Sequence, residues 1–414
     1  MRVVHFSASD RIGGASIMAY RLHKAMRLQG VDSHMLALDP LLTDAHIWTV
    51  RPLDRLLIKL ANHWRAGKLP RNAFGLRWDR SGIDPLSYPL VRNSDVYFVH
   101  SSGDGLVGTG AVERLLQTGK PVFIYLHDLS PVTGGCSCPM GCPSLETGCN
   151  DCPAGGGRRV AKSAARKREV YRHYPNLHIL AGSHGVRQLA QAAWACKGLS
   201  VQLLAPTLDT ELFSPRQRAT FRWLFGLSKR AKCLLFVGDT RSPEQGWDRL
   251  QAALSQLKLY EWSVVLLGSS DVWGDNAPFP CKRVVALDRL YDEASLAALY
   301  NAVDLTVVPS LRGGFGRVAI ESICCGTPVV GLDYGGLSDW VQHGLNGYLA
   351  KVEGLQDATV LQLSEAIQRG VEQTLSYEQR MEIATAMAAR VGYEKVVPAL
   401  IQGLQSLTRK VGLT

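Results

Sequence analysis

The sequence predicts an α/β protein made of two domains, each built around a parallel sheet. The chain has 414 residues, more than a single ordinary core holds. Short apolar runs alternate with longer helical patterns, and strands that alternate with helices indicate parallel sheets. The runs expected to form strands are Val3–Phe6, His34–Leu38, Val96–Val99, Val122–Leu126, Ile179–Ala181, Leu234–Val237, Val264–Leu267, Val284–Ala286, Leu305–Val308 and Val329–Val330.

These runs fall into two series that meet near residues 204–213. We therefore expect a first domain over residues 1–205 and a second over residues 206–388. Residues 389–414 are expected to form a final helix that packs back toward the first domain. Residues 48–89 have weak periodicity, and we interpret them as a mobile excursion of the first domain.

The composition is that of a globular protein with excess positive charge. Hydrophobic residues make up 46% and charged residues 20%, and the formal net charge is +10. This charge suits nucleic acid, anionic lipid or a phosphorylated substrate, and it does not choose among them. The chain opens directly on a strand-like run, and no run approaches the ~18 apolar residues of a membrane span. We expect a cytoplasmic protein.

Glycines and histidines follow several of the expected strands in the first domain. Gly13 and Gly14 come after the first strand and open a helix, where backbone amides can approach an anion. The alternative is a plain turn between strand and helix. His100 and His127-Asp128 each stand where a strand ends, at the edge of a parallel sheet that binds ligands. A histidine there can position or deprotonate an acceptor hydroxyl.

Five of the ten cysteines lie within seventeen residues, at Cys136, Cys138, Cys142, Cys149 and Cys152. In a reducing compartment such crowding indicates a metal more than disulfides. Four thiolates suit a structural zinc or an iron–sulfur cluster, and unligated thiols are the alternative. With Cys138 as the spare residue, the expected ligands are the other four. A closed site of four cysteines has no open position for catalysis.

Residues 156–174 form a basic, helix-like segment. Seven basic residues fall between residues 158 and 172, a pattern that fits contact with anionic lipid. A solvated face is the alternative. Nucleic acid is not an expected partner, because no nucleic-acid motif accompanies the charge.

The second domain carries two further glycine turns. Gly238 ends the first strand of its series and Arg241 follows, which suits a diphosphate. The segment Pro309–Val330 reads as a turn, a glycine loop, a helix with Glu321, and a strand. This order aims backbone amides at a phosphate and predicts an anionic, nucleotide-type ligand.

Taken together, these motifs resemble the family 4 glycosyltransferases, which have the GT-B fold of two facing Rossmann-like domains. The resemblance runs over nearly the whole chain. The block Thr133–Pro153 is similar to that of a bacterial subgroup that makes exopolysaccharides, including colanic-acid-type transferases. The matching motifs are Gly13-Gly14-Ala15, His127-Asp128, Ser183, Leu208-Asp209 with Phe213, Phe236-Val237-Gly238, Pro309–Val330, Gly335-Gly336 and His343–Tyr348.

The resemblance implies a retaining transfer of a sugar from a UDP- or GDP-type donor to a glycan or lipid-linked acceptor. No metal cofactor is implied for catalysis, because cationic side chains and helix N-termini stabilise the departing diphosphate. Contact of the basic segment with anionic lipid would place the protein peripherally at the inner membrane face. From the motifs and the resemblance together, the predicted site residues are His127 and Glu321 as catalytic residues; Gly238, Arg241, Gly314, Phe315, Gly316 and Glu321 on the donor side; Gly13, Gly14, His100, His127 and Asp128 on the acceptor side; and Cys136, Cys142, Cys149 and Cys152 as zinc ligands.

Three positions depart from the family pattern. Gly313 stands where the first glutamate of the paired-glutamate motif is expected. Asp239 and Gln245 replace the arginine and lysine that neutralise the leaving diphosphate, and Arg241, Arg312 or Arg317 could substitute. Two alternatives follow. The chain could be a non-catalytic binding subunit, or an enzyme of the same fold with an altered donor.

Overall fold

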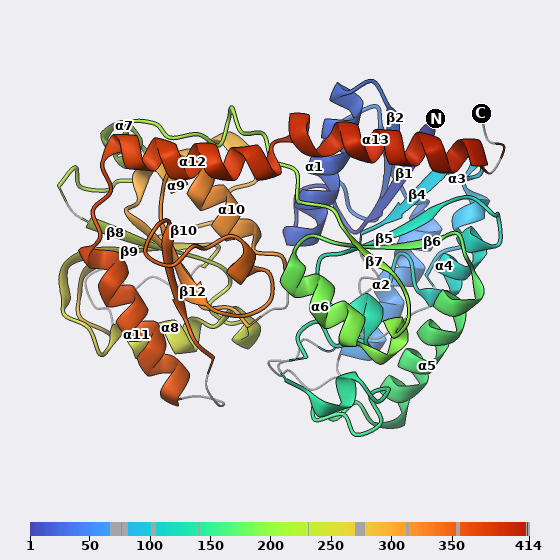
Figure 1. The fold of residues 1–414 in the computed structure, drawn as a ribbon, viewed down its shortest axis with the longest axis horizontal. Helices are drawn as coiled ribbons and strands as arrows, with labels where there is room; N and C mark the ends of the chain where they lie inside the picture. Colours follow the sequence, from blue (N-terminus) through green and yellow to red (C-terminus); the bar gives the residue numbers. More distant parts are fainter. Residues whose placement is uncertain are drawn as a thin grey trace. The chain divides into compact units, whose positions relative to one another are not determined.

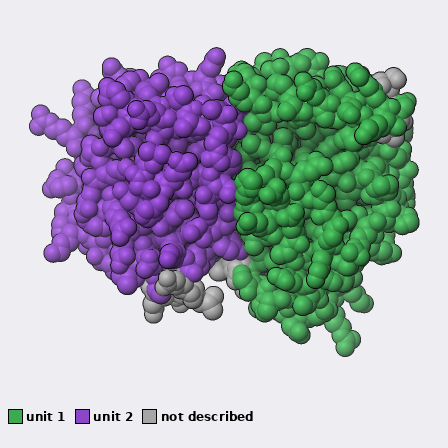
Figure 2. All heavy atoms as spheres, in the orientation of Figure 1, with its two compact units in different colours: residues 1–207, 313–315, 393–414 green, residues 208–312, 316–392 purple. Residues whose placement is uncertain are grey.

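The computed structural model describes residues 1–66, 76, 82–100, 105–139, 141–230, 232–269, 278–311, 314–352, 357–410 and 412. The chain forms two compact units (Figure 2). The first comprises Met1–Thr207, Gly313–Phe315 and Tyr393–Thr414, and the second comprises Leu208–Arg312 and Gly316–Gly392. Among the described residues, no helix is long and apolar enough to cross a membrane.

The first unit is built on a seven-stranded parallel sheet with the order β3-β2-β1-β4-β5-β6-β7 (Figure 1). Its strands are β1 (Arg2–Ser7), β2 (Asp32–Ala37), β3 (Ile47–Thr49), β4 (Val96–Val99), β5 (Val122–Leu126), β6 (Leu177–Ala181) and β7 (Val201–Leu203). Its helices are α1 (Gly14–Leu28), α2 (Pro52–Ala66), α3 (Pro89–Arg92), α4 (Thr109–Leu116), α5 (Gly157–His173), α6 (His184–Ala192) and α13 (Tyr393–Lys410). Every residue of β4 and β5 is buried, as expected for central strands that helices cover on both faces.

The second unit is built on a six-stranded parallel sheet with the order β10-β9-β8-β11-β12-β13. Its strands are β8 (Lys232–Val237), β9 (Leu259–Leu267), β10 (Cys281–Leu287), β11 (Leu305–Val308), β12 (Val329–Leu332) and β13 (Gly347–Ala350). Its helices are α7 (Arg218–Leu224), α8 (Trp247–Leu254), α9 (Glu293–Ala302), α10 (Arg317–Cys324), α11 (Asp357–Glu372) and α12 (Tyr377–Val391).

All ten strands predicted from the sequence are present, and both sheets are parallel, so the predicted α/β class is confirmed. Three strands, β3, β7 and β13, were not predicted. The strands β3 and β7 have three residues each and lie at the two edges of the first sheet, where the apolar signal is weak. The segment we interpreted as an excursion contains β3 and the 15-residue helix α2.

The strand orders show where each unit has its ligand-binding edge. The order reverses between β1 and β4 in the first unit and between β8 and β11 in the second. In open α/β sheets, ligands bind outside the carboxyl ends of the strands at such a reversal. The glycine turn at Gly13 follows β1, and His100 follows β4. Gly238 follows β8, and the glycine loop follows β11.

The last helix belongs to the first unit. Figure 1 shows α13 crossing α1, and the two helices are in contact. Val397 and Leu404 of α13 are 0% and 1% exposed, in one cluster with Val3, Leu22 and Met26. The last 22 residues of the chain thus complete a core that its first 30 residues begin.

Candidate functional site

The turn after β8 is fixed by two side chains that the sequence had marked as departures. The side-chain oxygen Oε1 of Gln245 accepts a hydrogen bond from the backbone N–H of Asp239 at 2.9 Å. A Cβ atom at Gly238 would lie 2.1 Å from the same Oε1, so a larger residue there would displace the Gln245 side chain. Gln245 therefore occupies the space beside Gly238 as an uncharged brace of the turn.

The charged groups discussed at this turn are the Asp239 carboxylate and the guanidinium groups of Arg241 and Arg289. Asp239 accepts hydrogen bonds from the backbone N–H of Arg241 at 3.0 Å and from its guanidinium at 3.2 Å. These bonds and the nearby charge of Arg289 hold the pKa of Asp239 below its ordinary value. The Arg241 side chain is 75% exposed. Arg289 comes directly after β10, so both arginines stand at the carboxyl edge of the sheet.

The glycine loop after β11 leads into α10 as predicted. Gly316 has φ +84°, and a Cβ atom there would lie 2.9 Å from the Trp340 ring, so glycine is required both by conformation and by space. The helix then begins at Arg317 and ends at Cys324. Its free N–H groups and its dipole make its N-terminus favourable for an anion.

Glu321 lies on α10 with no exposed surface and with its carboxylate held on both oxygens. The Tyr300 hydroxyl donates to Oε2 at 2.8 Å, and the Arg317 guanidinium donates to Oε1 at 2.7 Å and to Oε2 at 2.9 Å. Burial and the Glu321 charge raise the pKa of Tyr300, so this phenol remains a donor. Arg317 thus neutralises a buried carboxylate of its own helix. The sequence predicted a possible phosphate ligand at this position and did not indicate this ion pair.

Two residues of the predicted donor loop, Gly314 and Phe315, are grouped with the first unit. A Cβ atom at Gly314 would lie 3.3 Å from the backbone oxygen of His127, and the Phe315 ring centroid is 5.5 Å from the His127 ring. Gly313 and Arg312, on which the sequence raised questions, lie outside the described residues.

The predicted acceptor-side residues gather at the carboxyl edge of the first sheet. Gly13 has φ +87° and precedes α1, which begins at Gly14. His100 and His127 follow the neighbouring strands β4 and β5, and Nδ1 of His100 lies 2.9 Å from Nε2 of His127. The carboxylate of Asp128 accepts from the Ser130 N–H at 2.8 Å and so turns the chain away from the sheet. The two histidines expected from the sequence are therefore in direct contact.

The cysteine loop forms a small apolar cluster beside α5. Cys136 and Cys149 are buried in it and Cys152 packs against it. Burial raises the pKa of Cys136 and of Cys149, and nearby thiols add to the effect. Among the described residues, no three His, Cys, Asp or Glu side chains are grouped as metal ligands. The zinc prediction remains a prediction.

The basic segment forms α5 as expected, but several of its cations face the protein. Lys167 is 2% exposed and donates to the backbone oxygens of Ser130 at 2.7 Å and Thr133 at 2.9 Å. The Arg168 guanidinium lies 4.5 Å from the centroid of the Trp194 ring. Arg158 and Lys162 are exposed. Arg166 and Arg172, in the second half of the helix, are also exposed, and Arg166 forms ion pairs with Glu113 and Glu169.

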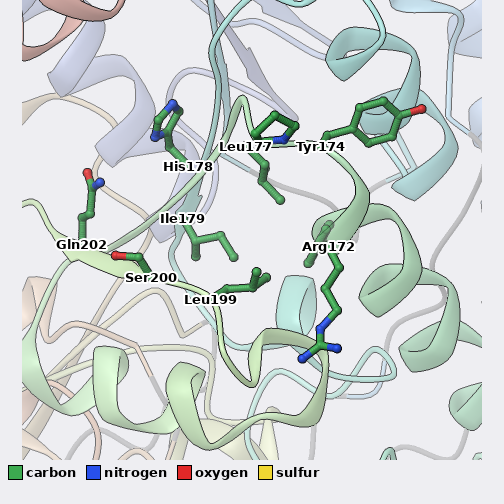
Figure 3. A pocket seen from close by; sticks show the side chains of 10 residues that line it. Arg172, Tyr174, Leu177, His178, Ile179, Leu199, Ser200 and Gln202 are labelled. Atoms are coloured by element: carbon green, nitrogen blue, oxygen red, sulfur yellow. The ribbon is translucent and has the colours of Figure 1, made fainter.

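A pocket of about 200 Å³ lies away from all these residues (Figure 3). It is lined by the end of α5 and by the amino ends of β6 and β7, including Arg172, Tyr174, His178 and Gln202. His178 stacks on Phe123 with ring centroids 4.7 Å apart, and burial lowers its pKa. The pocket is therefore at the end of the sheet opposite to His100 and His127.

Comparison with known proteins finds a family match within the second unit. Residues 231–369 match the family described as "Glycosyl transferases group 1". A D-inositol 3-phosphate glycosyltransferase of Thermobispora bispora is 34% identical over 163 residues, which is 36% of this chain and 38% of that protein. Another, from Nocardiopsis dassonvillei, is 28% identical over 236 residues, 54% of each protein. The chain therefore spans about two fifths to one half of the length of these curated relatives.

Solved structures match over nearly the whole chain. Sucrose-phosphate synthase from Thermosynechococcus elongatus has a TM-score of 0.68 at 18% identity, covering 99% of this chain and 100% of that one. HepE of Anabaena, in complex with UDP and glucose, has a TM-score of 0.62 at 18% identity, covering 98% and 100%. WaaG, a glycosyltransferase involved in lipopolysaccharide biosynthesis, has a TM-score of 0.58 at 14% identity, covering 99% and 98%. The fold is GT-B.

In this GT-B protein, three side chains contact the residues discussed above and were not predicted from the sequence. They are Arg289 beside Asp239, Tyr300 on Glu321, and His5, whose Nδ1 lies 2.9 Å from Nε2 of His100. Each is distant in sequence from its partner. His5 carried a signal that could have been used, since it lies in a buried strand that neighbours the strand before His100.

Proposed function

We propose that the protein is a retaining glycosyltransferase that moves a sugar from a nucleoside diphosphate donor to a glycan or lipid-linked acceptor. The observation that carries this proposal is the match of residues 231–369 to the group 1 glycosyltransferases. That stretch contains the reversal between β8 and β11, with Gly238 on one side and the glycine loop on the other. A nucleotide-type ligand fits this edge, because amides and a helix N-terminus converge on it.

The donor side is assigned from the second unit and the glycine loop. The diphosphate would lie near Gly238, with the N-terminus of α10 and the Arg241 and Arg289 side chains offsetting its charge. Glu321 would receive the ribose hydroxyls. The bonds from Tyr300 and Arg317 hold this carboxylate in one orientation on α10.

The acceptor side is assigned to the first unit, at Gly13, Gly14, His100, His127 and Asp128. The departing diphosphate itself would take the proton of the incoming hydroxyl as the new bond forms on the same face, which retains the anomeric configuration. Positioning and electrostatic stabilisation then supply most of the catalysis. His127 would orient a hydroxyl group at this point.

A panel of UDP- and GDP-sugars tests the proposal. We expect the purified protein to bind one nucleoside diphosphate, to release it from the corresponding sugar when an acceptor is present, and to give a product whose anomeric configuration matches that of the donor. Nuclear magnetic resonance of the product reports the configuration. A protein that binds none of these nucleotides and transfers no sugar would contradict the proposal and leave the binding-subunit alternative.

The role of Glu321 is tested with a matched pair of variants. Glu321→Gln retains the shape of the side chain and an oxygen for Arg317, and we expect it to weaken nucleotide binding by roughly tenfold or more, about 1.4 kcal/mol. Glu365→Gln changes an exposed carboxylate on α11 and serves as the control. Calorimetric titration measures the affinities, and thermal unfolding of both variants separates lost binding from lost folding.

We also propose that the exposed cations of residues 158–172 bring the protein to an anionic membrane surface at the cytoplasmic face. Arg158, Arg159 and Lys162 are the exposed basic residues in the first half of α5. Sedimentation with anionic vesicles, compared with neutral ones, tests the contact. We expect binding to the anionic vesicles that is lost at high salt, because exposed charges are screened. Equal binding to both vesicle types would rule out this electrostatic contact.

A further inference from the structure

Three histidines of the first unit form a continuous hydrogen-bonded chain. Nε2 of His127 lies 2.9 Å from Nδ1 of His100, and Nε2 of His100 lies 2.9 Å from Nδ1 of His5. They come from the neighbouring strands β5, β4 and β1 or from the residue just after a strand. The His5 ring stacks against Phe98, at 5.0 Å, and against His100, at 5.2 Å. The rings are thus held in register by packing as well as by hydrogen bonds.

Burial favours the neutral form of all three imidazoles. His5 and His100 are 0% and 3% exposed, and burial holds the pKa of each well below its ordinary value. Burial also lowers the pKa of His127 to about 4, against a smaller opposing effect of Asp128. A neutral imidazole has one N–H donor and one nitrogen acceptor. Each ring in the chain must therefore donate in one direction and accept from the other.

The number of protons restricts the chain to two arrangements. Three neutral rings carry three N–H groups, and two of these are used in the two internal hydrogen bonds. The third stands at one end, either on Nε2 of His5 or on Nδ1 of His127. Within the described part of the chain, neither atom has a hydrogen-bond partner. The tautomer of every ring is therefore coupled to that of the other two.

The surroundings of the two ends favour one arrangement. His5 has no exposed surface, and its neighbours include the rings of Phe98 and His23. An N–H group on Nε2 there would be a buried donor without an acceptor, which costs roughly 1–3 kcal/mol. The Nδ1 atom of His127 is also covered, but the residue keeps some exposed surface at the carboxyl edge of the sheet, and the neighbouring Asp128 charge favours a proton on its ring. A ligand that reaches Nδ1 at this edge can supply an oxygen that accepts the proton, whereas His5 has no exposed surface.

We propose that His5 and His100 are positioning residues that fix His127 in the tautomer with its proton on Nδ1, so that His127 offers a hydrogen-bond donor to a ligand oxygen. In this arrangement His5 Nδ1–H donates to His100, and His100 Nδ1–H donates to Nε2 of His127. His127 then has no free lone pair, so it orients an oxygen and does not remove a proton. The role of the ligand oxygen rests on the proposed function, whereas the tautomer is a property of the free protein.

Selective ¹⁵N labelling of histidine tests the tautomer directly, because the protonated and bare nitrogens of a neutral imidazole resonate far apart. His5→Phe retains a stacked ring but removes both nitrogens. His5→Asn can place an amide N–H close to the position of Nδ1. His178→Phe is the matched control, since His178 also stacks on a phenylalanine of the same sheet and lies outside the chain. Thermal unfolding checks that each variant folds.

We expect the His127 proton on Nδ1 in the wild type, in His5→Asn and in His178→Phe. In His5→Phe we expect a population of molecules in which His127 carries its proton on Nε2. His100 has lost the N–H donor of His5 that determined which of its own nitrogens is protonated. A wild-type His127 protonated on Nε2, or a tautomer unchanged in folded His5→Phe, would overturn the proposal. If the tautomers are as expected but the protein uses no nucleotide sugar, the coupling of the three histidines is supported and the proposed function is contradicted.

Discussion

His23 is a buried histidine of α1 that lies outside the chain of three but beside it. Its ring centroid is 5.9 Å from that of His5, and its Nδ1 is 2.9 Å from the Ser33 hydroxyl. Burial lowers the pKa of His23 to about 3, and the opposing charge of Asp44 only partly offsets this effect. The native state therefore keeps His23 neutral well below the pH at which the unfolded chain binds a proton.

This difference makes stability depend on pH in a definite direction. Above about pH 6.5, His23 is neutral in both the native and the unfolded state, so its titration does not lower the free energy of unfolding there. As the pH falls, His23 binds a proton in the unfolded chain but not in the native state, so the free energy of unfolding decreases. At pH 5 the loss from His23 is about 2 kcal/mol. Urea unfolding at pH 7 and pH 5 measures it.

His23→Gln removes this titration and should reduce the loss between pH 7 and pH 5 by about the same amount. His173→Gln, at an exposed position near the end of α5, should leave the pH dependence unchanged. An identical pH dependence in wild type and His23→Gln would contradict this account.

At the scale of elements, α5 is a brace for the cysteine loop. Lys167 projects from its buried face, and its ammonium group donates to the backbone oxygens of Ser130 and Thr133 at the start of the loop. The Tyr171 hydroxyl donates to the backbone oxygen of Pro131 at 2.9 Å. The sequence counts Lys167 among surface cations, and only the packing shows that it is internal.

Lys167→Met should therefore destabilise the first unit. The methionine fills similar volume but leaves two buried oxygens without this donor, at a cost of roughly 1–3 kcal/mol. Lys162→Met, on the exposed face of the same helix, should change stability by less than about 0.5 kcal/mol. Thermal and urea unfolding compare the two. Equal effects of both substitutions would show that Lys167 does not brace the loop.

The cysteine loop gives a second prediction at this scale. The sequence pattern predicts one zinc ion per chain held by Cys136, Cys142, Cys149 and Cys152. Metal analysis of the purified protein should then find one zinc, which Cys152→Ser releases and Cys281→Ser, in the other unit, retains. A chelator should lower the unfolding temperature of the wild type, because structural zinc contributes to folding. Zinc-free protein with ten titratable thiols would establish the free-thiol alternative.

At the scale of the whole molecule, the order of strands and the return of α13 organise the first unit. Leu404 is 1% exposed in the cluster that α13 shares with α1 and the sheet. The chain must therefore be complete before this core can close. Domains whose ends pack together in this way gain stability from contacts that are very distant in sequence.

Leu404→Ala should cost roughly 2–5 kcal/mol of the stability of the first unit, because it opens a cavity in a closed core. Gln402→Ala, two residues earlier and exposed, is the control and should be nearly neutral. Differential scanning calorimetry can follow the transition. A Leu404→Ala protein that unfolds like the wild type would show that α13 is dispensable for this core.

The sequence alone predicted the ten strands that carry both sheets, the glycine turns at Gly13, Gly238 and Gly316, and the helix that holds Glu321. These features are local: apolar runs, glycines and helix patterns report the conformation of their own segment. The short edge strands β3 and β7 were missed because three partly exposed residues carry little apolar signal.

The tertiary structure decided which polar groups meet. His5 and His100 are 95 residues apart, and they touch only because β1 and β4 are neighbours where the strand order reverses. Tyr300 reaches Glu321 from α9, and Lys167 turns inward from a helix that reads as a basic surface. Hydrogen bonds and desolvation depend on neighbours in space, so the neutral histidine chain and the buried ion pair at Glu321 could not be derived from segments taken singly.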